Sequence, residues 1–265
     1  MTERPMFEAA RWHAAVANRG SRRVFDGAPI DPRSAEILAE TADSFRPYAD
    51  ARAVFLPVAP ATLFSGIIGS YGRVTDAPSA FVFIENPSSA TAEEHCGYTG
   101  EGLVLEACAL GLATCWIAGS FSPNVARGLV DLAPGEIVRG VSPVGHASAT
   151  YPASERLIYG AGKPKHRRAL DEIAPGHEAW PMWAREGLAA AQVAPSAVNR
   201  QPWRFRYEDG AVTVSAKGLD APRYRPRLDC GIAMLHFELG TRMAEGDGTW
   251  VSLPAPDVAR WEPFV

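Results

Sequence analysis

The sequence predicts a protein of mixed helices and strands whose two halves are built alike, and three observations indicate this. A helix, a glycine stop, a threonine, a tryptophan and a strand occur in that order twice, at 109–117 and at 244–251. Asp209-Gly210 separates two short strand-like runs and is typical of a tight antiparallel hairpin. No G-x-G-x-x-G pattern follows a strand, so a parallel dinucleotide-binding fold is not expected.

The composition is that of an ordinary globular protein. Of 265 residues, 47% are hydrophobic and 21% are charged, which is ample for a buried core. The formal net charge of -4 gives no reason to expect a nucleic-acid partner. No apolar run approaches the roughly 18 residues that span a membrane, and no apolar signal segment is seen near residue 1. The cysteines form neither a C-x-x-C pair nor a zinc spacing, so we expect reduced thiols, no metal and a cytoplasmic location: Cys96, Cys108, Cys115 and Cys230.

Periodic apolar runs define the expected elements of the first half. They predict helices over 6–19, 33–45 and 97–112 and strands over 52–58, 80–85, 113–117 and 137–145. Asp31 is expected to cap the second helix with Pro32 at its first position, and Ser122 and Pro123 repeat this arrangement. The 97–112 helix is apolar almost all round, which is typical of a helix buried in a core or a large interface.

The second half repeats the order of the first. Its apolar runs predict helices over 178–193 and 232–245 and strands over 203–207, 212–216 and 248–251. The stretch between the halves is basic and has no clear periodicity. We therefore expect a first half, 1–145, an irregular basic connector, 146–177, and a second half, 178–265, in one unit that has the form of a fused pseudo-dimer.

Two stretches of the first half have the composition of ligand-binding segments. In an extended backbone Arg19, Ser21 and Arg23 share one face, and two guanidiniums beside a hydroxyl suit a phosphate group. The same residues are also typical of a solvated basic turn after a helix. The glycine-rich approach to the 80–85 strand, which contains Ser70 and Arg73, would let backbone come close to a ligand, or it is a flexible loop.

A polar turn at 194–203 is the feature around which the second half is organised. Pro195 ends the preceding helix because it disfavours helical geometry at the residue before it. Ser196, Asn199 and Gln201 can then present hydrogen-bonding groups to one planar, polar-edged ligand. Since such residues are common in loops, the turn also fits an ordinary helix-to-strand connection.

Together these motifs resemble those of the FMN-dependent nitroreductase family. That family opens with a helix and R-x-S-x-R, matched by Arg19 to Arg23, and carries A-P-S-x-x-N-x-Q-P-W, matched without gaps at 194–203. Its buried helix ends in L-G-L-x-T-C-W, matched at 110–116, and Lys165 with Arg167 resembles its K-x-R. The likeness covers most of the chain.

The resemblance implies an α+β fold with a mixed, mostly antiparallel sheet flanked by helices. It implies FMN as cofactor, with NAD(P)H reducing the flavin and a nitroaromatic, a quinone or a related small acceptor then oxidising it. Members are usually homodimers in which one subunit supplies the phosphate groups and the other the P-S-x-x-N turn. Here one chain carries both, and its first half lacks that turn, so we expect one site in a monomer that mimics a homodimer.

Each part of the expected site has a role implied by the family. The FMN phosphate is expected to be bound by Arg19, Ser21, Arg23, Lys165 and Arg167. The turn residues Pro195, Ser196 and Asn199 are expected to approach the flavin from the other half. Backbone N–H groups of Ala118 and Gly119 are expected at the flavin edge near N5, and Ser70 and Arg73 near N1 and O2. Since the flavin carries the chemistry, no dedicated catalytic acid is expected.

Two other functions remain open from the sequence. The protein could hold flavin for storage, sequestration or sensing without turnover. It could also perform a different flavin reaction, such as reductive dehalogenation or desaturation. NAD(P)H oxidation with a quinone or nitro acceptor distinguishes the oxidoreductase from the storage protein.

Overall fold

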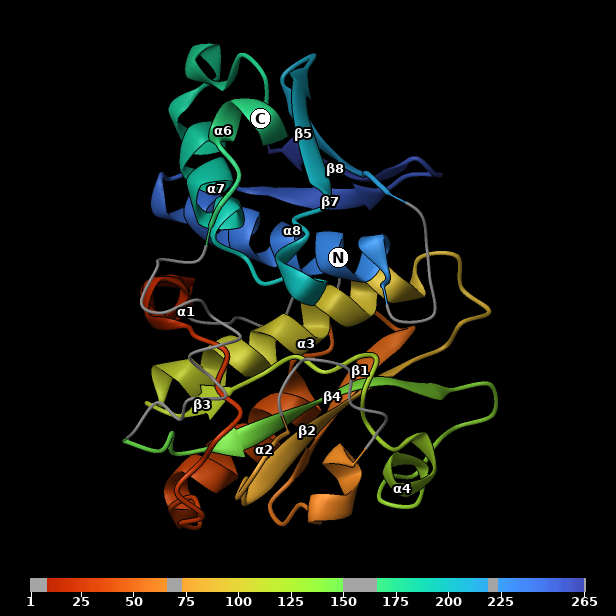
Figure 1. The fold of residues 1–265 in the computed structure, drawn as a ribbon. Helices are drawn as coiled ribbons and strands as arrows, with labels where there is room; N and C mark the ends of the chain where they lie inside the picture. Colours follow the sequence, from red (N-terminus) through yellow and green to blue (C-terminus); the bar gives the residue numbers. More distant parts are fainter. Residues whose placement is uncertain (1–8, 66–72, 150–165, 219–223, 265) are drawn as a thin grey trace.

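The computed structural model describes residues 9–65, 73–149, 166–218 and 224–264. The first half forms one four-stranded antiparallel sheet in the order β1-β2-β4-β3, with helices packed on it (Figure 1). Its elements are α1 (Ala9–Asn18), α2 (Pro32–Ser44), β1 (Ala51–Leu56), η1 (Ala61–Phe64), β2 (Ser79–Glu85), α3 (Ala92–Ala109), β3 (Ala113–Thr114), α4 (Pro123–Arg127) and β4 (Ile137–Gly145).

The second half forms a second four-stranded antiparallel sheet, in the order β5-β6-β8-β7. Its elements are α6 (Leu170–Ile173), η2 (His177–Ala179), α7 (Met182–Gln192), η3 (Ala197–Asn199), β5 (Trp203–Glu208), β6 (Ala211–Ala216), α8 (Pro226–Met243), β7 (Gly248–Ser252) and β8 (Asp257–Pro263). The strand orders of the two sheets are equivalent. Even the irregularity in register recurs, at Phe83/Ile84 against β4 and at Val214/Ser215 against β8. The expected α+β fold with two similar halves is therefore confirmed.

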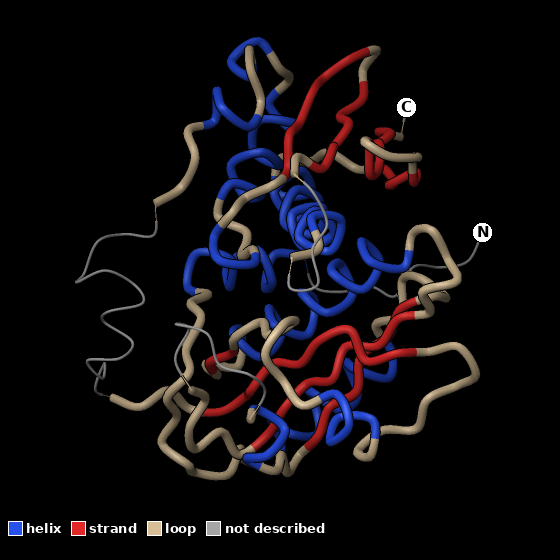
Figure 2. The backbone as a smooth tube through the Cα atoms, turned by 45° about the vertical axis from the view of Figure 1, so that its right-hand side comes forward, coloured by secondary structure: helices blue, strands red, loops and turns tan. Residues whose placement is uncertain are grey.

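The two halves meet through α3 and α8, which lie side by side between the sheets (Figures 1 and 2). Each helix has a glycine where the other comes closest. A Cβ added at Gly97 would lie 2.0 Å from the carbonyl oxygen of Leu228, and one added at Gly231 would lie 1.9 Å from that of Glu94. Only glycine permits this separation, so these two positions set how closely the halves approach.

One hydrophobic core extends across both halves and includes Leu105 of α3 and Phe237 of α8. A second, smaller core lies on the other face of the first sheet. β2 is buried throughout, with Phe81 and Phe83 in the large core and Val82 in the small one. The first sheet is therefore covered on both faces, with η1 and α4 over its outer side (Figure 1).

Several predicted boundaries differ from the structure. α3 and α8 begin at Ala92 and Pro226, more than one turn before their apolar runs, because the acidic side chains in those first turns have partners: arginines for Glu93 and Glu94 of α3, and the N–H of Ala197 for Asp229 of α8. Asp31 caps α2 as predicted, accepting from the N–H of Ser34 at 3.0 Å. Ser122 is the N-cap residue of α4 with Pro123 at the first helical position, as predicted, but its side chain makes no capping hydrogen bond. The connector contains the short helix α6, and β8 was not predicted at all.

Among the helices of the described residues, none combines the length and the apolar character that crossing a membrane requires.

Candidate functional site

The turn between α7 and β5 has a strained backbone. Val198, Asn199 and Gln201 have φ angles of 48°, 57° and 51°, in the left-handed region that residues other than glycine rarely adopt. For a β-branched residue such as Val198 this is a clear outlier. Each such residue costs on the order of 1–2 kcal/mol, so the conformation persists only because its surroundings impose it. Strain of this kind is concentrated at binding and catalytic sites.

Polar side chains on both sides of the turn impose this conformation. The N–H of Gln201 donates to the hydroxyl of Ser196 at 2.9 Å, which closes the turn on itself. The buried Gln201 amide accepts from the N–H of Arg168 at 2.8 Å and donates to the carbonyl of His166 at 3.1 Å. Asn199 also donates to His166, at 2.8 Å. The end of the connector is therefore bound along the turn.

Arg167 occupies the space between the turn and the end of α7. Its Nη1 donates to the carbonyl of Ala194 and its Nη2 to that of Val193, both at 2.7 Å, and Nη1 lies 3.3 Å from Oδ1 of Asn199. A cation is favourable at a helix C-terminus, where carbonyls are left without partners. Burial and then the nearby Arg19 guanidinium lower the pKa of Arg167 to about 10. The charge of Arg19, from the first half, is therefore felt by Arg167 beside the turn.

Asp229, in the first turn of α8, fixes the other side of the turn. Both of its carboxylate oxygens accept from the N–H of Ala197, at 3.1 and 3.2 Å. Burial raises the pKa of Asp229 to about 7, although the Ala197 N–H and the charge of Arg200 act in the opposite direction. This carboxyl was not among the predicted site residues, and it links α8 directly to the strained turn.

Replacing Asp229 with Asn is expected to remove a pH dependence from folding. Because its pKa is about 7 in the folded state and 3.8 ordinarily, the folded state retains a proton that the unfolded chain releases between these values. The contribution of this proton to the free energy of unfolding is therefore complete below about pH 4 and is lost as the pH rises through about 7. The free energy of unfolding changes by on the order of a few kcal/mol across this window. Urea unfolding of the wild type, Asp229→Asn and the exposed control Asp43→Asn across this window measures it. If the free energy of unfolding changes with pH in the same way in the wild type and in Asp229→Asn, the raised pKa of Asp229 is contradicted.

Arg19 is deeply buried at the end of α1, with its side chain only 3% exposed. Its Nε lies 3.7 Å from Oε1 of the fully buried Glu101, and it has no hydrogen-bond partner among the described residues. Glu101 also accepts from Nε1 of Trp116 at 2.7 Å and faces Nε2 of His236 at 2.8 Å. His236 in turn faces the carbonyl of Ala190 at 3.2 Å, so one buried polar network joins α1, α3, α8 and α7.

The rest of the R-x-S-x-R segment runs along the first sheet. Ser21 forms a parallel bridge with Thr114 of β3, and the carbonyl of Arg23 accepts from the N–H of Thr75 at 2.9 Å. The exposed Arg73 precedes Thr75 by two residues, so it is in the segment that continues from this bond. The extended backbone expected over 19–23 is thereby placed between two neighbouring segments.

Ala118 and Gly119 follow directly on a short bridge between Ile117 and Val141. The bridge leaves their backbone outside the sheet, with Gly119 exposed. Gly140 permits this approach, because a Cβ there would lie 3.1 Å from the carbonyl oxygen of Ile117. The described residues show no contact that joins this pair to the turn.

The structure therefore brings some predicted residues together and leaves others apart. Arg167 contacts Asn199 and is influenced by the charge of Arg19, while Pro195 is buried and Ser196 lies within the same turn. Arg167 was expected to bind phosphate, but both its Nη atoms are used by the chain's own carbonyls, so its direct role is to hold the turn. Ser70 and Lys165 lie outside the described residues.

Comparisons with known proteins identify the family and the fold. A family model described as "Putative TM nitroreductase" matches residues 13–241. A crystal structure of a "putative nitroreductase" from Thermotoga maritima is 19% identical, with a TM-score of 0.61, and the match covers 98% of this chain and 97% of that one. It shows that the fold is shared over the whole chain.

Smaller structures match about half of the chain. An FMN-dependent nitroreductase from Clostridium difficile is 17% identical with a TM-score of 0.43, covering 53% of this chain and 92% of its own. A nitroreductase with bound FMN from Bacteroides fragilis is 16% identical with a TM-score of 0.42, covering 56% and 92%. No curated protein matches the chain.

Proposed function

Because this chain belongs to the family described as "Putative TM nitroreductase", we propose that it is an FMN-dependent oxidoreductase that uses NAD(P)H to reduce small acceptors such as nitroaromatics and quinones. The observation that carries the proposal is the buried Nε–H of Arg19, which lacks an acceptor among the described residues while its charge lowers the pKa of Arg167 beside the strained turn. Cationic groups from the first half and an irregular polar turn from the second half converge there. This is the arrangement that a phosphate-bearing planar cofactor requires.

The residues present fit the FMN phosphate. The Nε–H of Arg19 is a buried donor that lacks an acceptor among the described residues, and phosphate oxygens are strong acceptors. Arg167 has no carboxylate partner among those residues, and its lowered pKa reflects unrelieved burial and repulsion. A phosphate beside Arg19 would accept from its Nε–H and would offset the repulsion that Arg167 experiences. Ser21 and Arg23 continue the same extended segment and complete the proposed phosphate site.

FMN, when bound, supplies the hydride chemistry, and the chain supplies position and electrostatics. The strained turn from Ser196 to Gln201 holds its polar groups in one orientation, so no reorganisation is needed when the ring binds. Ala118 and Gly119 offer backbone N–H groups outside the sheet, and the exposed Arg73 offers a positive charge to an electron-rich ring edge. No side chain is assigned as a proton donor.

The absorbance spectrum of the purified protein is the first test of the proposal. We expect flavin bands and about one FMN per chain, and loss of those bands when NADH or NADPH is added without oxygen. Menadione or a nitroaromatic compound should restore them. A protein that takes up no added FMN would overturn the cofactor assignment. FMN that neither nucleotide reduces would instead leave a storage or sensing protein.

Arg23→Glu is expected to abolish flavin retention. A lost charge-assisted bond costs about 1.5–3 kcal/mol and the reversed charge adds repulsion, so affinity for FMN should fall at least about tenfold. Quenching of flavin fluorescence during titration of the apoprotein measures this. Arg33→Glu makes the same charge change at an exposed position on α2 and should bind FMN as the wild type does. Equal affinity in both variants would mean that the phosphate lies elsewhere.

A further inference from the structure

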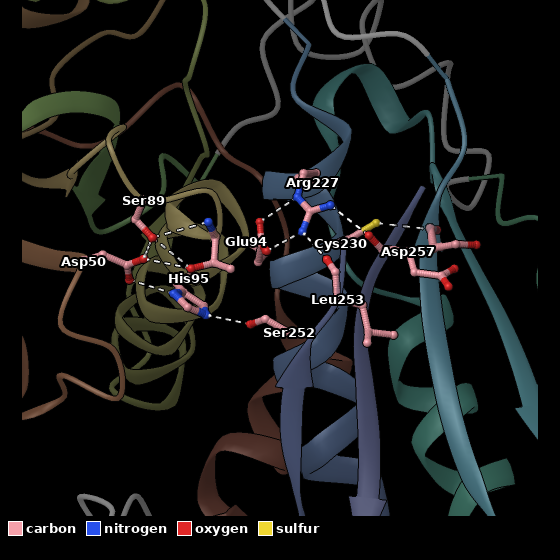
Figure 3. Close-up of polar contacts among 11 residues, drawn as sticks. Asp50, Ser89, Glu94, His95, Arg227, Cys230, Ser252, Leu253 and Asp257 are labelled. Atoms are coloured by element: carbon pink, nitrogen blue, oxygen red, sulfur yellow. Dashed lines mark hydrogen bonds and ion pairs between the residues drawn. The ribbon is translucent and has the colours of Figure 1, made fainter. Parts of the chain in front are cut away.

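A second group of polar side chains lies where the end of the second sheet meets the start of α3 (Figure 3). Asp50 directly precedes β1, His95 is in the first turn of α3, and Ser252 is the last residue of β7. Nδ1 of His95 lies 2.6 Å from Oδ1 of Asp50, and its Nε2 lies 3.4 Å from Oγ of Ser252. A serine, a histidine and an aspartate therefore form a continuous series across the two halves.

The protonation pattern of this series follows from the partners. The Asp50 carboxylate can only accept, so Nδ1 of His95 carries the hydrogen, and Nε2 of the neutral ring is free to accept from Ser252. Burial opposes the charge of Asp50, but the hydrogen bonds from His95, from Ser89 at 2.5 Å and from Thr91 at 3.0 Å outweigh it and lower its pKa to about 2. The orientation that a general base needs is thus imposed from the Asp50 side.

The imidazole plane is fixed as well. Tyr48 stacks on His95 with the ring centroids 3.7 Å apart and the planes 4° from parallel. The His95 side chain is only 11% exposed, whereas Ser252 is an exposed residue. A buried, oriented base next to an exposed hydroxyl is the pairing found in nucleophilic catalysis.

Arg227 holds the two sides of this site together. Its guanidinium binds both carboxylate oxygens of the fully buried Glu94, at 2.5 and 2.9 Å, directly before His95 in α3. The same guanidinium donates to the carbonyl of Leu253 at 3.3 Å, directly after Ser252, and to that of Asp257 at 2.8 Å, at the start of β8. Figure 3 shows this link beside the Ser252–His95 contact. The serine and its base therefore have a common support.

The register of β7 leaves a donor next to the hydroxyl. Leu253 donates its N–H to the carbonyl of Val258, so the preceding residue, Ser252, which is paired with Ala259, points its N–H away from β8. β7 is an edge strand of the second sheet, so no neighbouring strand of that sheet lies on the side to which this N–H points. A backbone donor on the nucleophile's own residue is a usual part of an oxyanion site.

We propose that Ser252, His95 and Asp50 form an acyl-transfer site for small activated esters, separate from the redox site. Oγ of Ser252 attacks the ester carbonyl carbon and passes its proton to Nε2 of His95, while the N–H of Ser252 donates to the carbonyl oxygen. The C–O bond to the alcohol breaks, and the alcohol leaves with the proton from Nε2. Water then attacks the acyl-serine, Nε2 takes its proton and returns it to Oγ, and the carboxylic acid leaves. Asp50 acts through His95 as a positioning residue.

The protein as purified, with no nucleotide added, is treated with 4-nitrophenyl acetate and separately with a fluorophosphonate. Peptide mass spectrometry then locates the adduct. We expect modification of Ser252, absent in Ser252→Ala and unchanged in Ser44→Ala, which removes an exposed hydroxyl bonded only to its own helix. His95→Gln should slow acylation by about 10²-fold or more. Asp50→Asn should slow it similarly, and Asp50→Glu should restore part of the rate.

Circular dichroism and the midpoint of thermal unfolding identify variants that fold. If the His95 and Asp50 variants do not fold, the wild-type protein alone still tests the proposal. In that sample Ser252 must be acylated at least about tenfold faster than Ser44. An unmodified Ser252, equal reaction at both serines, or an unchanged rate in folded His95→Gln would overturn the proposal. Ser252, His95 and Asp50 would then be only a structural tie between the halves.

Discussion

Gly231→Ala is expected to destabilise the protein by about 2 kcal/mol or more. The new methyl group would lie 1.9 Å from the carbonyl oxygen of Glu94, a backbone atom of the facing helix that cannot rotate away. Separating α3 from α8 would relieve the clash, but it would open the core that both halves share. The better helix propensity of alanine returns only about 1 kcal/mol.

Urea unfolding followed by circular dichroism measures this effect. Gly128→Ala is the matched control, because a Cβ there would meet its nearest neighbours at 3.5 and 3.7 Å and the backbone is right-handed. Gly97→Ala should behave like Gly231→Ala, since its Cβ would lie 2.0 Å from the carbonyl of Leu228. If the Gly231 variant is as stable as the control, the helices do not approach as closely as described.

Glu101→Ala is expected to cost about 3–5 kcal/mol, the range for removing one partner of a buried ion pair. The buried Arg19 guanidinium would lose its facing carboxylate, the N–H of Trp116 would lose its acceptor, and the His236 ring would lose its polar partner at Nε2. Each unsatisfied buried donor adds to the loss. Glu101→Gln keeps one acceptor oxygen, so its stability should lie between those of the wild type and Glu101→Ala.

The control for this change is Glu36→Ala, which removes an exposed glutamate from α2 and should alter stability by less than about 0.5 kcal/mol. FMN titration of the folded variants adds a functional comparison. Arg19 would be free to move once Glu101 is gone, so flavin affinity should change in the Glu101 variants and not in the control. A Glu101→Ala protein as stable as the Glu36 control would show that the network is not buried as described.

The sequence predicted most of the fold because its repeated units obey local rules. Asp31 and Pro32 start α2, and the Asp209-Gly210 hairpin joins β5 to β6. β8 was missed because Val258 and Ala259 are both buried next to the bulge at Val214/Ser215, which breaks the alternation expected of a strand. The division at 145 and 178 stays a prediction.

The candidate site was less predictable, because its supporting residues are distant in sequence. The turn motif was visible, but the use of Arg167 by the carbonyls of Val193 and Ala194 depends on how the connector folds back. Glu101 was overlooked inside a largely apolar helix, although an acid in such a run needs a buried partner. Asp229 was placed before α8, when Pro226 at the first helical position marks the true start.

The packing of α3 on α8 within one polypeptide has a consequence for how the proposed flavin site forms. Two subunits that build a shared site must find each other, and their occupancy falls on dilution. Here the covalent connection makes that encounter intramolecular, at an effective concentration that does not depend on how much protein is present. Flavin affinity should therefore be the same at nanomolar and micromolar chain, whether or not the chain also self-associates.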